Sequence, residues 1–239
     1  MNKKDFTFII PAAGRSKRFK TKKSKIFYIY KNKTLIQHII EKCLKFSKNI
    51  IIVSNKKNLN ELKLNLIKYK NKNIKIVIQK KQKGMGDAIS IAMNRVKTKF
   101  SSVIWSDQIY LNNETIKKTI NFFLKKKSIL CFPVYKKKLP YVYIIRDKKN
   151  KFQDIIQTRE MNKNIKMGES DCGFFVFKSK IVKEKLKFLI KKKLILTKKT
   201  REIDFLKSFK FLKQTGNIDL INAKNYKDTI GINFLGDLI

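Results

Sequence analysis

FTFIIPAAGRSKRF, residues 6–19, is the stretch of sequence that decides the fold. Its first part, residues 6–10, is an apolar run typical of a buried strand. The small residues 12–14 follow, and they leave backbone N–H groups open to the close approach of a base and phosphates. Three cations come next and can surround a polyphosphate: Arg15, Arg18 and Lys25. The loop is neither a Walker A motif nor a G-x-G-x-x-G fingerprint, because the required later glycines are absent.

Beyond this stretch, apolar runs alternate with amphipathic patterns. Strands are predicted at residues 6–10, 50–53, 74–78, 102–105 and 129–132, and helices at 34–46, 58–67, 84–96 and 113–124. Regular alternation with short connections favours an α/β fold with a mostly parallel sheet flanked by helices.

The regular alternation of strands and helices ends in the second half of the chain. A hairpin is predicted from residues 141–146 and 152–157, then a strand at 174–177, helices at 180–191 and 201–211, and a strand at 218–221. No Pro/Gly/Ser linker interrupts the chain, so we expect one domain. Residues 1–135 would form its nucleotide-binding part and residues 136–239 its acceptor-binding part.

Charge is the most unusual feature of the composition. The chain has 58 Lys and Arg against 17 Asp and Glu, a net charge of +41, and only six of the basic residues are Arg. This excess indicates an anionic partner without naming it. Lys accompanies abundant Ile and Asn, residues with A/T-rich codons, so codon bias is the simpler cause. The lysine runs at 125–127, 136–138 and 191–193 are expected to be solvated helix ends and loops.

Cysteine and histidine are too few for a disulfide framework or a zinc cluster. The three cysteines show no C-x-x-C spacing, and the single histidine, His38, is expected to pack on its helix. No apolar stretch approaches the 18 residues of a membrane span, and the N-terminal apolar run is too short for a signal sequence. We therefore expect a cytoplasmic protein that does not contact a membrane.

The opening motif resembles that of the sugar-1-phosphate nucleotidyltransferases, and most of all their N-acetylglucosamine-1-phosphate uridylyltransferase branch. The matching segments are PAAGRSKRF at residues 11–19, the Ser24-Lys25 pair and NKTLIQH at residues 32–38. Ser16 stands where glycine is frequent, and Ser24 stands in place of proline. The resemblance implies a Rossmann-like sheet and nucleotide-binding roles for Ala12, Ala13, Gly14 and Arg15.

Three further segments resemble the family in the same order. QKKQKGMGDA at residues 79–88 is similar to the base-reading loop, which implies base contacts from Gln79, Gln82 and Gly84. VIWSDQ at residues 103–108 and TIGIN at residues 229–233 are similar to the two metal-binding segments. They imply that Asp107 and Asn233 hold Mg²⁺, a role that suits oxygen ligands after a parallel strand.

The implied reaction is attack of a phosphate-monoester oxygen on the α-phosphorus of an NTP, with UTP favoured and pyrophosphate released. The nucleophile is already anionic, so catalysis needs positioning and charge neutralisation. The resemblance implies that Arg18, Lys25 and Asp107 are the catalytic residues. The resemblance covers nearly all 239 residues, and the acetyltransferase domain of the bifunctional members is not expected.

The acceptor side departs from the family pattern. Val142 follows Tyr141 where the family has glycine, Gln157 replaces glutamate, and Asp171 replaces asparagine. Candidate acceptor-binding residues are Tyr141, Gln157, Asp171 and Glu202, with Glu169 as a further carboxylate. A sugar 1-phosphate is the first choice of acceptor, and acidic groups could also favour phosphocholine.

Alternatives stay open at this point. A cytidylyl or guanylyl donor is possible within the same class. A non-catalytic, basic nucleotide- or nucleic-acid-binding protein on the same fold is the alternative from another class, although the lysines show no concentrated face. We expect an NTP and a phosphorylated small molecule as partners and no specific nucleic acid, while the sequence gives no oligomeric state.

Overall fold

A central sheet carries the fold in the computed structural model, which describes residues 2–14, 19, 24–160 and 165–238. Its first half is parallel and consists of β1 (Phe6–Pro11), β4 (Asn49–Ser54), β5 (Asn73–Ile78) and β6 (Phe100–Ile104). Strand β1 lies between β4 and β6, so the loop that follows β1 leaves from the middle of the sheet.

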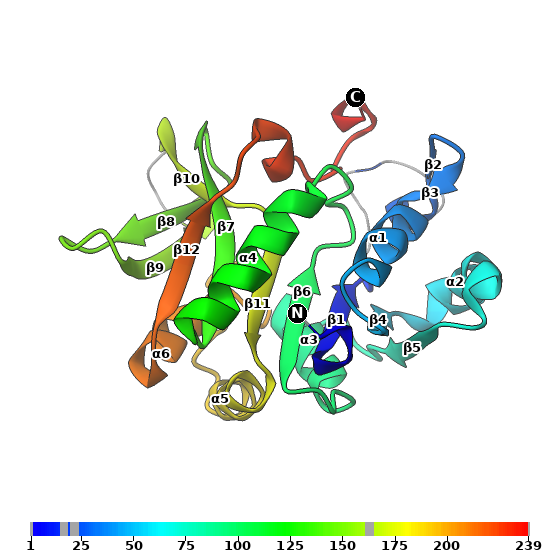
Figure 1. The fold of residues 1–239 in the computed structure, drawn as a ribbon, viewed down its shortest axis with the longest axis horizontal. Helices are drawn as coiled ribbons and strands as arrows, with labels where there is room; N and C mark the ends of the chain where they lie inside the picture. Colours follow the sequence, from blue (N-terminus) through cyan, green and yellow to red (C-terminus); the bar gives the residue numbers. More distant parts are fainter. Residues whose placement is uncertain (1, 15–18, 20–23, 161–164, 239) are drawn as a thin grey trace.

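The second half of the sheet mixes strand directions. Its strands are β7 (Leu130–Lys138), β10 (Met167–Asp171), β11 (Phe174–Lys178) and β12 (Ile218–Asn222). The order is β10-β7-β11-β6-β1-β4-β5, with β12 beside β7. Because β11 is antiparallel to both β6 and β7, those two strands run in the same direction. The carboxyl ends of β1, β6 and β7 therefore meet at one edge of the sheet (Figure 1).

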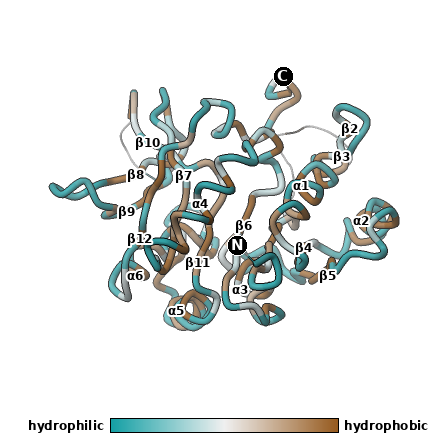
Figure 2. The backbone as a smooth tube through the Cα atoms, viewed as in Figure 1, coloured by the Kyte–Doolittle hydropathy of each residue, from teal (hydrophilic) through white to brown (hydrophobic). Residues whose placement is uncertain are grey.

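Helices cover both faces of the sheet and bury two apolar cores. One core lies under α1 (Leu35–Leu44) and α4 (Asn113–Lys126), and α4 crosses in front of the sheet in Figure 1. The other lies under α3 (Met85–Met93), α5 (Ser179–Lys191) and α6 (Ser208–Leu212). Strand β1 alternates between them, since Phe8 packs in the first core and Ile9 in the second. Figure 2 shows the result as apolar central strands and polar loops.

Short elements complete the chain. They are the pair β2 (Ile29–Tyr30) and β3 (Lys33–Thr34), helix α2 (Leu59–Leu66), and the hairpin β8 (Val142–Arg146) and β9 (Phe152–Gln157). No helix in the described ranges has the length and hydrophobicity needed to cross a membrane. The predicted α/β architecture, with a mostly parallel core, flanking helices and a hairpin in the second half, is confirmed.

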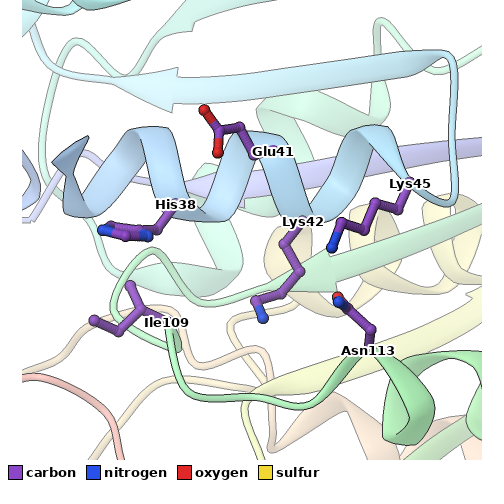
Figure 3. A pocket seen from close by; sticks show the side chains of 6 residues that line it. All are labelled: His38, Glu41, Lys42, Lys45, Ile109 and Asn113. Carbon is purple, nitrogen blue, oxygen red and sulfur yellow. The ribbon is translucent and has the colours of Figure 1, made fainter. Parts of the chain in front are cut away.

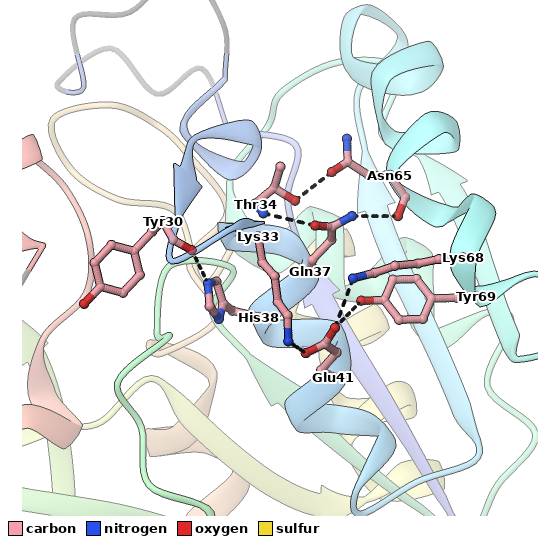
Figure 4. Close-up of polar contacts among 9 residues, drawn as sticks. All are labelled: Tyr30, Lys33, Thr34, Gln37, His38, Glu41, Asn65, Lys68 and Tyr69. Carbon is pink, nitrogen blue, oxygen red and sulfur yellow. Dashed lines mark hydrogen bonds and ion pairs between the residues drawn. The ribbon is translucent and has the colours of Figure 1, made fainter.

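A polar network fixes α1 against the segment that follows α2. The Glu41 carboxylate accepts hydrogen bonds from Lys33 (2.6 Å), Lys68 (3.1 Å) and Tyr69 (3.0 Å), as Figure 4 shows. Burial would raise the pKa of Glu41, but these three donors outweigh burial and lower it to about 2. These contacts hold helix α1 in place against the segment that follows α2.

Two sequence predictions about the second half are wrong. Residues 201–207 are not helical, because Leu196 and Ile203 form a β-bridge and the Ile203 backbone bonds to the loop before α3; only α6 is helical there. The lysines 136–138 are not in a loop: they end strand β7, and Lys137 is half-buried. Tertiary contacts decided both outcomes.

Candidate functional site

The candidate site lies where three distant segments meet at the carboxyl edge of the sheet. The first follows β1, the second follows β6 and contains Asp107, and the third is the C-terminal segment that ends in Asn233. Ligands gather outside the carboxyl ends of parallel strands, so the topology alone marks this edge. The backbone links two of the segments directly, since the Ile232 N–H donates to the Asp107 carbonyl at 3.0 Å.

Lys25 joins the three segments. Its Nζ lies 2.5 Å from Asp107 Oδ2 and donates to the Ile232 carbonyl at 2.9 Å. The two side chains are 16% and 17% exposed, so this ion pair is partly withdrawn from water but still reachable. An ammonium and a carboxylate in this setting attract each other more strongly than a pair on the open surface. The structure thus brings together the two residues expected to handle phosphates and metal.

Asp107 and Asn233 offer a donor set that fits Mg²⁺. The Asn233 amide nitrogen donates to the Gly231 carbonyl at 3.0 Å, so the amide oxygen points away from that carbonyl. Gly231 carries no side chain, and a Cβ there would lie 3.5 Å from the Asp107 carboxyl carbon. One carboxylate and one amide oxygen are hard ligands, and Mg²⁺ commonly takes few protein ligands, completing its shell with phosphates and water. The described residues contain no group of three His, Cys, Asp or Glu that could hold a metal.

Asp237 holds the Asn233 segment in shape. Its Oδ2 accepts hydrogen bonds from the backbone N–H of Asn233 at 2.7 Å and of Phe234 at 2.8 Å. Sequence reasoning missed this residue, because a carboxylate four positions after an asparagine is a common local turn feature. Its effect is to fix the backbone that presents Asn233.

The expected base-reading loop is tied to the loop after β1. Gln82 donates to the Ala13 carbonyl at 2.6 Å, and Asn55 donates to the same carbonyl at 3.0 Å. Gln79 is buried and donates to the Gly84 carbonyl at 3.1 Å and to Asp87 at 2.7 Å. These bonds hold the two loops as one unit. Ala12 and Ala13 are buried and Gly14 is exposed, with open space where a side chain would be.

Gly84 makes room for the segment that contains Glu202. Its φ is +104°, and a Cβ at this position would lie 2.6 Å from the Ile203 carbonyl oxygen and 2.9 Å from the Glu202 Cβ. Backbone bonds pair the segments, with Ile203 N–H donating to Lys83 at 2.7 Å and Gly86 N–H donating to Ile203 at 2.8 Å. Glu202 therefore stands beside the base loop, and its acceptor-binding role stays a prediction.

The predicted acceptor residues lie around the hairpin. Gln157 ends β9, and its amide nitrogen donates to Asp204 Oδ2 at 2.8 Å. The carbonyl of Tyr141 accepts from the Thr158 backbone at 2.9 Å, which closes the hairpin, and the Tyr141 side chain is exposed. Glu169 was a further candidate, but Arg146 binds it through two nitrogens at 2.5 and 2.9 Å, so it joins β8 to β10.

Asp171 is a buried carboxylate near the centre of this edge. Burial raises its pKa to about 6, and the Asp107 charge adds to the rise, although the Gly173 N–H donates to it at 2.7 Å and Lys137 attracts it. Burial likewise lowers the pKa of Lys137, whose ammonium donates to the Thr229 hydroxyl at 3.3 Å. Sequence reasoning missed Lys137 because it stands within a run of three lysines.

The raised pKa of Asp171 predicts a pH-dependent difference between the wild type and Asp171→Asn. The ordinary value is 3.8, so the folded protein holds this proton more tightly than the unfolded chain. Below about pH 4 ionisation of Asp171 therefore does not lower the free energy of unfolding. As pH rises from there to about 6, ionisation lowers it progressively. The unfolding free energy of the variant minus that of the wild type should increase over this window, by at most roughly 3 kcal/mol. Urea titrations of both proteins at pH 4 to 7.5 measure it, and parallel curves would contradict the prediction.

Two expected site residues, Arg15 and Arg18, lie outside the described residues. Phe19, which follows them, is buried and packs edge-on against Tyr28 at 5.3 Å. Before Arg15, the Ala13 carbonyl is held by Gln82 and Asn55, and after Arg18, Phe19 belongs to the first core.

A separate cavity of about 180 Å³ lies between α1 and the loop before α4 (Figure 3). It is lined by His38, Glu41, Lys42, Lys45, Ile109 and Asn113. None of the predicted site residues lines it. His38 Nε2 lies 2.7 Å from the Tyr30 carbonyl, so the ring contacts β2, as expected of a structural histidine (Figure 4).

Comparison with protein families identifies one match. Residues 8–167 match the family described as "MobA-like NTP transferase domain". The matched range includes the loop after β1, the base-reading loop and Asp107.

Two relatives among known proteins carry the same name. The chain is 31% identical over 238 residues to the bifunctional protein GlmU of Buchnera aphidicola subsp. Schizaphis graminum, covering 98% of this chain and 49% of that protein. It is 29% identical over 186 residues to bifunctional GlmU of Caldicellulosiruptor saccharolyticus, covering 74% of this chain and 39% of that protein. The chain thus spans about half the length of these relatives or less. The nucleotidyltransferase family indicated by the four motifs is confirmed.

Solved structures with the same fold are more distant in sequence. A putative glucose-1-phosphate thymidylyltransferase of Bacillus anthracis superposes with a TM-score of 0.75 at 16% identity, over 92% of this chain and 88% of that one. A 4-diphosphocytidyl-2C-methyl-D-erythritol synthase of Anaerococcus prevotii gives 0.69 at 16% identity, over 99% and 96%. These two similarities establish the fold alone.

Proposed function

This chain belongs to the family of MobA-like NTP transferase domains, and on that premise we propose that it transfers a nucleotidyl group from an NTP to a phosphorylated small molecule. UTP is the favoured donor and a sugar 1-phosphate the favoured acceptor, because the four motifs resemble the N-acetylglucosamine-1-phosphate uridylyltransferase branch. The observation that carries the proposal is the meeting of Lys25, Asp107 and the Ile232–Asn233 backbone at the carboxyl edge of the sheet.

The reaction needs little acid–base catalysis from the protein. An acceptor phosphate oxygen forms a bond to the α-phosphorus of the NTP, and the bond to the β-phosphate bridging oxygen breaks, so pyrophosphate leaves. The attacking oxygen is already anionic, so no side chain has to remove a proton. The protein's contribution is to align the two phosphates and to neutralise their charge.

The loop after β1 and Lys25 would bind the triphosphate. Gly14 leaves open space at the mouth of the loop, and the Lys25 ammonium already stands beside Asp107. Arg15 and Arg18 are proposed to bind the β- and γ-phosphates from the same loop. Gln79, Gln82 and Gly84 would shape the base pocket, with the two glutamines holding the backbone that faces the base.

Asp107 and Asn233 would hold Mg²⁺. When bound, Mg²⁺ supplies positive charge that stabilises the charge developing on the transferred phosphoryl group. Asp237 keeps the Asn233 backbone fixed for this role, and Gly231 keeps the approach to Asp107 clear.

The two parts of the chain would divide the substrates. Residues 1–135 carry the nucleotide loops and Asp107, and residues 136–239 carry the hairpin, Gln157 and Asp171. We propose that Tyr141, Gln157 and Asp171 contact the acceptor, and that Glu202 contacts it from beside the base loop. A cytoplasmic location is part of the proposal, since three buried free cysteines suit a reducing compartment.

A pyrophosphate-release screen tests the proposal. Four NTPs are combined with a panel of sugar 1-phosphates and with phosphocholine, with Mg²⁺ present or chelated. We expect the highest kcat/KM for UTP with one sugar 1-phosphate, and loss of turnover on chelation. If none of the combinations released pyrophosphate, the proposed function would be refuted. A preference for CTP or GTP would change the assigned donor.

A further inference from the structure

Asp204 is a buried carboxylate with a fixed set of partners. It is 6% exposed, and it lies in the non-helical segment between the Leu196–Ile203 bridge and α6. Its Oδ2 accepts from the Gln157 amide at 2.8 Å, and its Oδ1 accepts from the Leu206 backbone N–H at 2.9 Å. Both oxygens are therefore engaged, and the carboxylate is not available to bind a cationic acceptor.

The carboxylate dictates the orientation of the Gln157 amide. An ionised carboxylate only accepts hydrogen bonds, so the NH₂ group of Gln157 must face it and the carbonyl oxygen must face away. That oxygen, Oε1, is buried and receives no hydrogen bond from the described residues. A buried carbonyl without a donor is unfavourable, so a substrate group that donates to it is preferred over one that does not.

The position of the pair connects it to both halves of the site. Gln157 ends the hairpin, while the neighbouring Ile203 is bonded through its backbone to Lys83 and Gly86 of the base loop. The segment that holds Asp204 thus lies between the base loop and the hairpin. A carboxylate fixed there can orient a hairpin side chain relative to the nucleotide.

We propose that Asp204 is a positioning residue that locks Gln157 with its carbonyl oxygen toward the acceptor, so that the site selects an acceptor with a hydroxyl or N–H donor. This inference rests on the proposed function. A sugar phosphate has such donors. Phosphocholine has none on its quaternary ammonium end, and it is therefore disfavoured.

Exchanging the amide of Gln157 and the carboxylate of Asp204 tests whether Asp204 orients Gln157. Asp204→Asn lets the amide of Gln157 turn either way, and Gln157→Glu places two carboxylates in hydrogen-bond contact. Each single variant should raise the KM for glucose 1-phosphate or N-acetylglucosamine 1-phosphate about 10- to 100-fold, with the KM for the NTP changed less than about threefold. The double variant Gln157→Glu/Asp204→Asn restores one donor facing one carboxylate and should recover most of the acceptor affinity.

Controls separate positioning from stability. Gln153→Glu makes the same change on an exposed position of β9 and should leave the acceptor KM unchanged. Thermal melts show whether a variant is folded, and only folded variants enter the cycle. Acceptor KM effects that add in the double variant, or singles that leave the acceptor KM unchanged, would overturn the inference. A wild type without turnover on any substrate pair would instead overturn the proposed function.

Discussion

Asp107→Asn is expected to lower kcat for pyrophosphate release about 10³-fold or more, the largest effect of any single substitution. The change keeps the shape of the side chain and its contact with Lys25 but removes the negative charge that would hold Mg²⁺. A loss of several kcal/mol of transition-state stabilisation corresponds to this factor. Steady-state pyrophosphate release at saturating NTP and acceptor measures it.

The matched control is Glu114→Gln. Glu114 is an exposed carboxylate on α4 that pairs with Lys224, and it loses the same charge without contacting the site. It should keep activity within about twofold of the wild type, because exposed ion pairs contribute little. Asp107→Asn activity within threefold of this control would remove Asp107 from the catalytic machinery.

Gly84→Ala is expected to lower the free energy of unfolding by about 3 kcal/mol. A side chain would meet the Ile203 backbone at 2.6 and 2.8 Å, and the φ of +104° strains any L-residue. The backbone cannot move aside cheaply, since Ile203 is bonded to Lys83 and Gly86. Urea denaturation gives the change, and a raised KM for the NTP should accompany it.

Gly236→Ala provides the comparison for that substitution. A Cβ at Gly236 meets nothing within 4 Å, so the change should stay within about 0.5 kcal/mol. Equal stabilities for the two variants would mean that the loop adapts and that Gly84 is not required for its geometry.

The parallel half of the fold could be predicted from local patterns. Apolar runs such as the one in β1 are buried on both faces, and amphipathic repeats such as α1 pack one face on the sheet. These signals are contained within single elements. Four of the strands and four of the helices were accordingly placed to within a few residues.

The second half depended on contacts between distant segments. Residues 201–207 have a helical pattern, yet bonding of Ile203 to the base loop keeps them out of a helix. Strand β10 has the sequence MGESD, which lacks a strand pattern and is held by β7. Neither outcome can be read from a local window, because the partner lies tens of residues away.

The candidate site divides in the same way. Lys25, Asp107 and Asn233 could be named from motifs, and topology explains why they meet. Asp204 and Lys137 could not be named, since their importance comes from burial and from partners that the sequence does not reveal.

The contact of Lys25 with the Ile232 carbonyl spans 207 positions of the chain. On the ribosome, at roughly 5 to 20 residues per second, the last segment of the site is made several seconds after Asp107. A nascent chain therefore already contains the loop after β1 and Asp107 while it still lacks Asn233. The candidate site is complete only when this last segment has been made, and a chain interrupted just before it would contain every described strand of the sheet without the third segment of the site.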